Sequence, residues 1–79
     1  MDQSAKFDEE LDARGLNCPL PILRTKKALS ALESGRILRV LATDKGAVRD
    51  FQAFAKQTGN ELIAFEASGE CLVFHLRKR

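Results

Sequence analysis

The sequence predicts an α/β (α+β) fold, a two-layer sandwich whose elements follow the order β-α-β-α-β-β. Four segments have strand patterns, two segments with helical spacing of apolar residues separate the first three of them, and a tight turn joins the last two. Two helices of similar length over one face of a four-stranded sheet make two layers. Right-handed crossovers make the first strand parallel to its neighbour, and the final hairpin adds an antiparallel pair. We therefore expect a mixed sheet whose other face is partly open.

The first strand is predicted at residues 6–14. Phe7, Leu11 and Ala13 share one parity, while acidic residues and Arg14 hold the other. This alternation indicates a short strand with one buried face. A Gly-Leu-Asn turn follows it.

The first helix begins at a pair of prolines and is predicted to run to residue 33. Pro19 suits the first helical position, because its missing N–H would have no intrahelical partner there and its φ is already set. Apolar residues then recur at helical spacing, and Gly35 is a natural stop at the C-terminal end.

The second half of the chain holds one helix and three strands. Residues 36–43 are rich in branched aliphatic side chains on both parities and predict a central strand. A second helix follows, with Asp44 as its cap and Gly59 as its stop. The last two strands form a hairpin at residues 61–67 and 71–77, joined by a tight Ser-Gly turn.

The bulk composition indicates a single globular domain over residues 1–79, with residues 1–5 as a frayed end. Hydrophobic residues make up 44% and charged residues 30% of the chain, which excludes the composition of disordered proteins. No apolar run reaches the roughly 18 residues that span a bilayer, and the first twelve residues are too acidic for a secretory signal. We expect a soluble, cytoplasmic protein without a membrane partner, whose two cysteines stay reduced thiols.

Charge is segregated along the chain. Residues 1–12 hold five acidic residues and one lysine, a net charge of −4, whereas residues 13–79 hold 12 basic and 6 acidic residues, a net charge of +6. A basic body can favour acidic proteins or nucleic acid. The basic residues are scattered, however, and the five Phe residues form no base-stacking motif. Direct binding of nucleic acid is therefore not expected.

Cys18 is the candidate working residue. A cysteine at a helix start lies in the positive end of the helix dipole, which favours thiolate over thiol. Pro19 and Pro21 have no N–H and stiffen the first turn, so Leu20 and Ile22 supply the free N–H groups nearest the sulfur.

Three cations are candidates for electrostatic support of an anionic Cys18 sulfur: Arg14, Arg24 and Lys26. The alternative is that Cys18 is only a small buried hydrophobic residue in front of a helix. Helix caps favour Ser, Thr, Asp or Asn over Cys, and this preference argues for a functional thiol.

The segment 11–21 reads Leu-Asp-Ala-Arg-Gly-Leu-Asn-Cys-Pro-Leu-Pro, with Cys-Pro-x-Pro a few residues after Leu-Asp-x-x-Gly. With the element order behind it, this segment resembles the TusA/SirA family of small sulfur-carrier proteins, and the likeness runs from residue 6 to residue 77. The resemblance implies a two-layer sandwich that carries sulfur as a persulfide on Cys18. It also implies a sulfur donor, such as a cysteine desulfurase or a rhodanese, and a downstream acceptor protein. Such a protein is a carrier more than an enzyme with turnover.

The position between the two prolines departs from part of this family. Members that serve tRNA thiolation typically carry an acidic residue there, and this chain has Leu20. An apolar side chain beside the thiol argues for a different donor or acceptor, so tRNA thiolation is only one of the outcomes that the resemblance allows.

Other candidate sites are weaker. Cys71 could relay sulfur and His75 could act as a base, but neither has a partner at motif spacing, and we expect both to be ordinary strand residues. Cys18, Cys71 and His75 lack the spacing of metal ligands, and Lys45-Gly46 lacks the rest of a phosphate loop, so neither a metal nor a cofactor is expected.

Two alternative functions stay open: a regulatory or interaction module that binds protein or nucleic acid without thiol chemistry, and a redox thiol that cycles through sulfenic acid.

Overall fold

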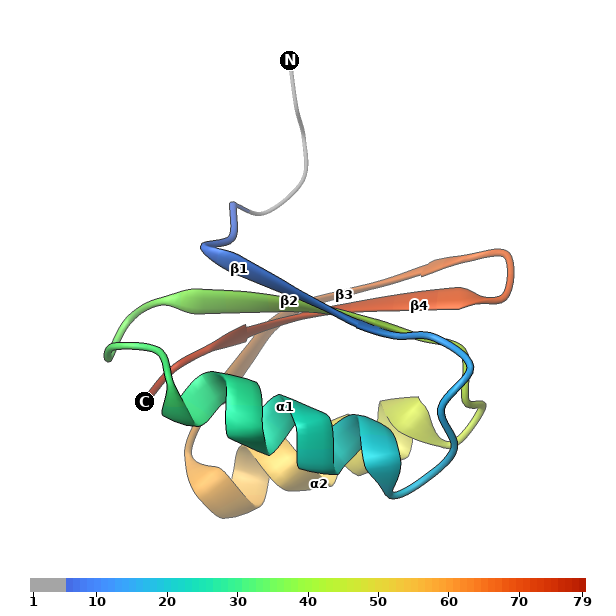
Figure 1. Cartoon of the computed structure of the whole chain (residues 1–79), viewed down its shortest axis with the longest axis horizontal. Helices are drawn as coiled ribbons and strands as arrows, with labels where there is room; N and C mark the ends of the chain where they lie inside the picture. The colour runs from blue at the N-terminus through green and yellow to red at the C-terminus, as the bar shows by residue number, and fades with distance from the viewer. Residues whose placement is uncertain (1–5) are drawn as a thin grey trace.

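The computed structural model describes residues 6–79 and contains the six predicted elements in the predicted order (Figure 1). They are β1 (Glu9–Ala13), α1 (Leu20–Ser30), β2 (Ile37–Ala42), α2 (Ala47–Thr58), β3 (Glu61–Ser68) and β4 (Cys71–Arg77). The frayed end predicted for residues 1–5 lies outside the described residues. Within the described part of the chain, no helix is long and apolar enough to span a bilayer.

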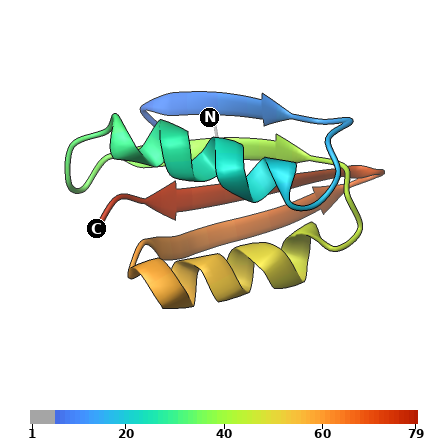
Figure 2. The ribbon, with the colours of Figure 1, turned by 60° about the horizontal axis from the view of Figure 1, so that its bottom comes forward.

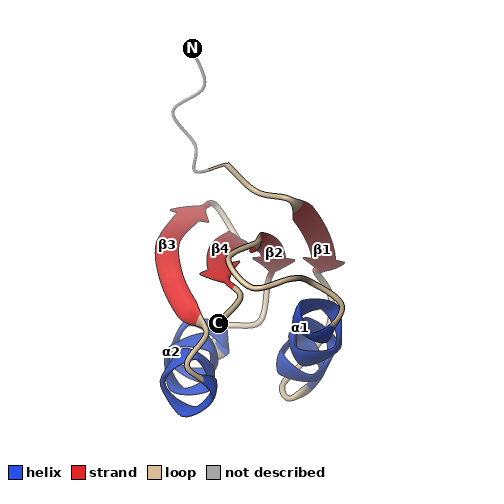
Figure 3. Cartoon of the chain, turned by 90° about the vertical axis from the view of Figure 1, so that its left-hand side faces the viewer, coloured by secondary structure: helices blue, strands red, loops and turns tan. Residues whose placement is uncertain are grey.

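The four strands form one mixed sheet in the order β1-β2-β4-β3. β1 is parallel to β2, and β4 runs antiparallel to both of its neighbours. Both helices cover the same face of this sheet, with α1 under β1 and α2 under β3 (Figure 3). The predicted two-layer sandwich with a mixed four-stranded sheet is therefore confirmed.

The core lies between the sheet and the two helices. Alternate residues of β2, namely Leu38, Val40 and Ala42, are fully buried. Phe51 of α2 stacks on Phe74 of β4 with the ring centroids 4.4 Å apart. Because side chains alternate across a strand, a slip of one residue would turn the buried set out to solvent, and the burial therefore specifies the register of the central strands.

The two helices end in different ways. α2 ends as predicted at Gly59, whose φ of 80° is a left-handed conformation that glycine adopts without steric cost. α1 ends at Ser30, three residues before the predicted end. Beyond it the Lys78 ammonium donates hydrogen bonds to the carbonyls of Leu29 and Leu32, at 2.7 and 3.1 Å. The Leu29 carbonyl also accepts the Leu32 N–H at 3.0 Å, so Lys78 adds a second donor there and a donor to the Leu32 carbonyl just past the helix. Local periodicity could not reveal this contact from the far end of the chain.

The start of α2 also differs from the prediction. The cap position belongs to Gly46, and no side chain bonds to the helix there, so Asp44 is not the N-cap. Asp44 Oδ2 accepts a hydrogen bond from the Gly46 N–H at 3.2 Å, and the Asp44 carbonyl accepts one from the Ala47 N–H at 3.0 Å. Asp44 therefore closes a turn before the helix begins, as short polar side chains often do.

The sheet face away from the helices is less open than predicted. Val73 and His75 point to this face, yet they are only 6% and 3% exposed. The Phe7 ring lies beside His75 with the centroids 6.2 Å apart, and the Arg39 guanidinium lies 5.1 Å from the centre of the Phe7 ring. Arg39 also pairs with Glu10 of the neighbouring strand, at 3.4 Å. One aromatic ring and long charged side chains thus cover the middle of this face.

Two leucine-to-alanine changes test the assignment of the core. Leu38 is fully buried, whereas Leu23 is 54% exposed on α1. We expect Leu38→Ala to lower the free energy of unfolding by about 2–5 kcal/mol, because it removes buried methyl groups and leaves a cavity. The same change at Leu23 should alter it by less than about 0.5 kcal/mol. Urea unfolding followed by circular dichroism measures both values, and equal losses would contradict the assignment.

Candidate functional site

Several chain segments meet at one end of the molecule. Because β1 and β2 are parallel, the helices that follow them both begin at the carboxyl ends of these strands. Figure 2 shows α1 and α2 running in the same direction, and the β3–β4 hairpin turns at the same end, on the right in Figure 1. The Gly15 N–H donates to the Thr43 hydroxyl at 2.9 Å and joins the loop before α1 to the loop before α2. The topology thus brings the loop that carries Cys18 next to the first turn of α2.

Cys18 is exposed and lies two residues before the first residue of α1. The cap position belongs to Pro19, so the thiol is not itself the helix cap, and the Cys18–Pro19 peptide bond is cis. The N–H of Leu20, which the sequence led us to expect free beside the sulfur, donates to the Asn17 carbonyl at 2.8 Å. That donor is therefore not available to an anionic sulfur.

The residues around the start of α1 divide into an inner and an outer set. Pro21 is buried, and Ile22 is half-buried and packs against the core. Pro19 is exposed, and the Leu20 side chain is 44% exposed. The inner pair anchors the first turn, and the outer pair lies at the surface next to Cys18.

Two recesses adjoin Cys18, and Asp50 from the first turn of α2 lines both of them. The remaining residues of the first recess come from the start of α2: Lys45, Gly46, Val48, Arg49 and Gln52. The second recess lies between the two helices and is also lined by Pro19, Ile22, Ala53, Phe54 and Gln57. The thiol therefore faces α2, and its charged neighbours belong to that helix and to the loop before it.

The pKa of the Cys18 thiol is raised above its ordinary value. The main cause is a hydrogen bond to the Asp50 carboxylate; burial of the sulfur and the negative charges of Asp50 and Asp44 act in the same direction. The sequence predicted the opposite shift, from the dipole of α1 with possible support from Arg14, Arg24 or Lys26. That prediction was wrong because the deciding carboxylate comes from the other helix.

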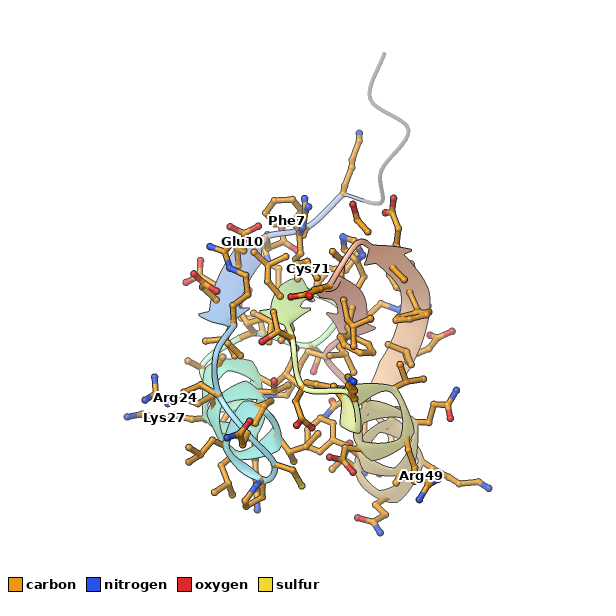
Figure 4. All side chains as sticks on the ribbon, turned by 90° about the vertical axis from the view of Figure 1, so that its right-hand side faces the viewer. Phe7, Glu10, Arg24, Lys27, Arg49 and Cys71 are labelled. Atoms are coloured by element: carbon orange, nitrogen blue, oxygen red, sulfur yellow. The ribbon has the colours of Figure 1, made fainter. Side chains whose placement is uncertain are left out.

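The cations predicted to support the sulfur lie elsewhere. Arg14 pairs with Asp12 through two side-chain hydrogen bonds, of 2.8 and 2.9 Å. Arg24 and Lys26 are exposed on α1 and line neither recess, and Figure 4 shows Arg24 pointing away from α2.

The charged neighbours of the thiol were missed from the sequence: Lys45, Arg49 and Asp50. A signal was nevertheless present. Cys18 follows the first strand, these three residues follow the second, and the carboxyl ends of parallel strands lie at one edge of a sheet. Pairing the two loops on that basis would have placed the three residues beside the sulfur.

Cys71 and His75 take no part in this site. Cys71 is half-buried at the start of β4, where it lies opposite Ser68, and His75 is buried beneath Phe7. Figure 4 shows Cys71 in the sheet layer, away from the helices. Among residues 6–79, no group of three or more His, Cys, Asp or Glu side chains is arranged to hold a metal ion.

The fold and the site define a small protein with a free cysteine thiol that is reached from the surface. The family described as Sulfurtransferase TusA matches residues 9–78. This chain belongs to the TusA family.

Related proteins and a solved structure agree with this assignment. The sulfur carrier protein TusA of Allochromatium vinosum is 61% identical over 74 residues, which cover 94% of this chain and 97% of that protein. YrkI of Bacillus subtilis is 52% identical over 73 residues, covering 92% of this chain and 97% of that protein. The crystal structure of a SirA-like protein from Desulfitobacterium hafniense superposes with a TM-score of 0.78 at 28% identity, covering 89% and 96% of the two chains. The resemblance to the TusA/SirA family is therefore confirmed.

The pairing of Arg14 with Asp12 can be tested by titration. The hydrogen bonds from Arg14 hold the pKa of Asp12 at about 2, below its ordinary 3.8. Since the folded-state pKa is depressed, the small stabilisation from this exposed pair is complete above pH 3.8 and is lost as the pH falls through about 2. We expect Arg14→Gln to raise the pKa of Asp12 towards 3.8, measured by NMR of the side-chain carboxyl carbon. Arg36→Gln removes a cation that pairs with Asp8 and should leave Asp12 unchanged; an unchanged Asp12 in Arg14→Gln would contradict the pairing.

Proposed function

We propose that this protein is a sulfur carrier that holds sulfur as a persulfide on Cys18. It receives the sulfur from a donor enzyme and passes it to an acceptor protein. The observation that carries the proposal is the exposure of Cys18 beside two surface recesses, within the Cys-Pro-x-Pro segment of a TusA-family chain. A thiol that exchanges sulfur with other proteins must be accessible at the surface, and Cys18 is accessible in this way.

The transfer chemistry needs no oxidant. In the loading step the Cys18 thiolate attacks the outer sulfur of a persulfide on the donor. The sulfur–sulfur bond of the donor breaks as the new bond to Cys18 forms, and the donor cysteine leaves as a thiolate. Cys18 releases one proton to form its thiolate, and the departing donor thiolate takes up one proton, so the protons balance. Delivery to the acceptor is the same exchange with Cys18 as the leaving thiolate, so the carrier undergoes no net oxidation.

The surface around the thiol suits a protein partner. Leu20 and Leu23 are exposed near the start of α1, the helix that follows Cys18, and apolar side chains of this kind favour protein contacts. The only acidic residue within α1 and α2 is Asp50, against five basic residues: Arg24, Lys26, Lys27, Arg49 and Lys56 (three of them labelled in Figure 4). Such a charge balance favours donors and acceptors with acidic surfaces.

The donor is of the cysteine desulfurase or rhodanese type. The exposed Leu20 between the two prolines favours an acceptor other than a tRNA-thiolation partner. Phe51 and Phe54 of α2 are buried, so they offer no platform for stacking bases, and direct binding of nucleic acid is not part of the proposal. A carrier whose thiol must be free between transfers suits the reducing cytoplasm.

Sulfur uptake tests the proposed function directly. The protein is incubated with a cysteine desulfurase and cysteine, and its intact mass is measured without reductant. We expect a gain of one sulfur atom that is abolished in Cys18→Ala and kept in Cys71→Ser, because only Cys18 is exposed beside the recesses. Absence of uptake by the unaltered protein from desulfurase and rhodanese donors alike would overturn the proposal and favour a binding module or a redox thiol.

A further inference from the structure

Asp50 lies beside the thiol although it belongs to a different helix. Among residues 6–79, only Cys18 and Asp50 line both recesses. The Asp50 carboxylate, as a hydrogen-bond acceptor for the thiol, is also the main cause of the raised pKa of Cys18. Asp50 is half-buried, whereas the two cations of the first recess, Lys45 and Arg49, are exposed. Solvent screens the exposed cations more strongly than it screens this carboxylate.

A second carboxylate lies near Asp50 at the start of α2. Asp50 belongs to the first turn of this helix. Asp44 lies near it: a Cβ at Gly46 would be 3.3 Å from Asp44 Oδ2 and 3.9 Å from Asp50 Oδ2. Two carboxylates thus flank Gly46, and both act on the sulfur in the same direction.

We propose that Asp50 is a positioning residue that holds the hydrogen of the Cys18 thiol and keeps the unloaded carrier unreactive until its sulfur donor is bound. The inference rests on the proposed function of Cys18 as the sulfur-carrying residue. A hydrogen bond to an ionised acceptor stabilises the neutral thiol, and loss of the proton would leave two negative charges side by side. Only the thiolate is a nucleophile, so the free carrier reacts slowly with electrophiles in solution.

The bound donor is what relieves this restraint. Asp50 and Cys18 line both recesses, so a donor docked in either recess covers the carboxylate and the thiol together. A donor group that pairs with Asp50 frees the thiol at the moment of transfer. Asp50 therefore makes Cys18 selective for its donor enzyme over small electrophiles. This selectivity is the rate of enzyme-dependent sulfur uptake divided by the rate of reaction with a small electrophile.

The rate of reaction with a small electrophile is measured by alkylation with iodoacetamide, followed by mass spectrometry across the pH range in which the thiol titrates. All variants carry Cys71→Ser, so that only Cys18 reacts. A fall of one unit in the pKa of the thiol raises the thiolate fraction about tenfold at a pH well below the pKa. The same fall lowers the nucleophilic reactivity of the thiolate about threefold. We expect Asp50→Asn to shift the profile to lower pH and to speed alkylation at neutral pH by about threefold or more. Asp44→Asn, which removes a nearby charge but not the hydrogen bond, should cause a smaller change.

Sulfur uptake from cysteine desulfurase is measured on the same variants. Asp50→Asn should speed uptake less than it speeds alkylation, so that the ratio of the two rates falls. An unchanged alkylation profile, an equal effect of Asp44→Asn, or an equal gain in uptake would each overturn the inference about Asp50. Absence of uptake in every variant, with the alkylation profile shifted as expected, would instead refute the carrier function and leave the Asp50–Cys18 interaction in place.

Discussion

The parallel pairing of β1 with β2 is the constraint on which the rest of the structure depends. It requires a crossover helix on one face and places the starts of α1 and α2 at the same end of the sheet. The buried alternation of β2 holds this pairing in register. Without it, the loop that carries Cys18 and the first turn of α2 would not meet, and the thiol would have no charged neighbours from the second helix.

The electrostatics of the thiol follow from that meeting. A helix dipole acts weakly on an exposed group outside the helix, whereas a carboxylate in direct hydrogen-bond contact acts strongly. The Asp50 carboxylate therefore outweighs the start of α1, and the pKa of Cys18 rises.

Much of the fold could be predicted from the sequence, because it depends on local periodicity. The order of elements, the central position of the second strand and the stop at Gly59 all follow from patterns within one segment. The features that were missed depend on contacts between segments. Lys78 contacts the end of α1 from the other end of the chain, and Phe7 covers His75 from outside β1.

The candidate site shows the same contrast between features that one segment determines and features that depend on contacts between segments. Cys18 was singled out because its sequence segment is distinctive and because cysteine is a poor helix cap. The candidates Arg14, Arg24 and Lys26 were chosen for closeness in sequence, and two of them lie on the helix that Cys18 precedes. Asp50 could be found only by matching the loops after two parallel strands. Distance along the chain was thus a poor guide to the charge around the sulfur.

The position of Cys18 between the two helix starts has a consequence for timing. In the proposed function, the donor and the acceptor both dock at the two recesses beside Cys18, so they cannot bind together. The carrier must dissociate from one partner before it meets the next, and during that interval the loaded or empty sulfur diffuses unaccompanied. The rate of such a relay then depends on encounter frequency and on the abundance of the carrier.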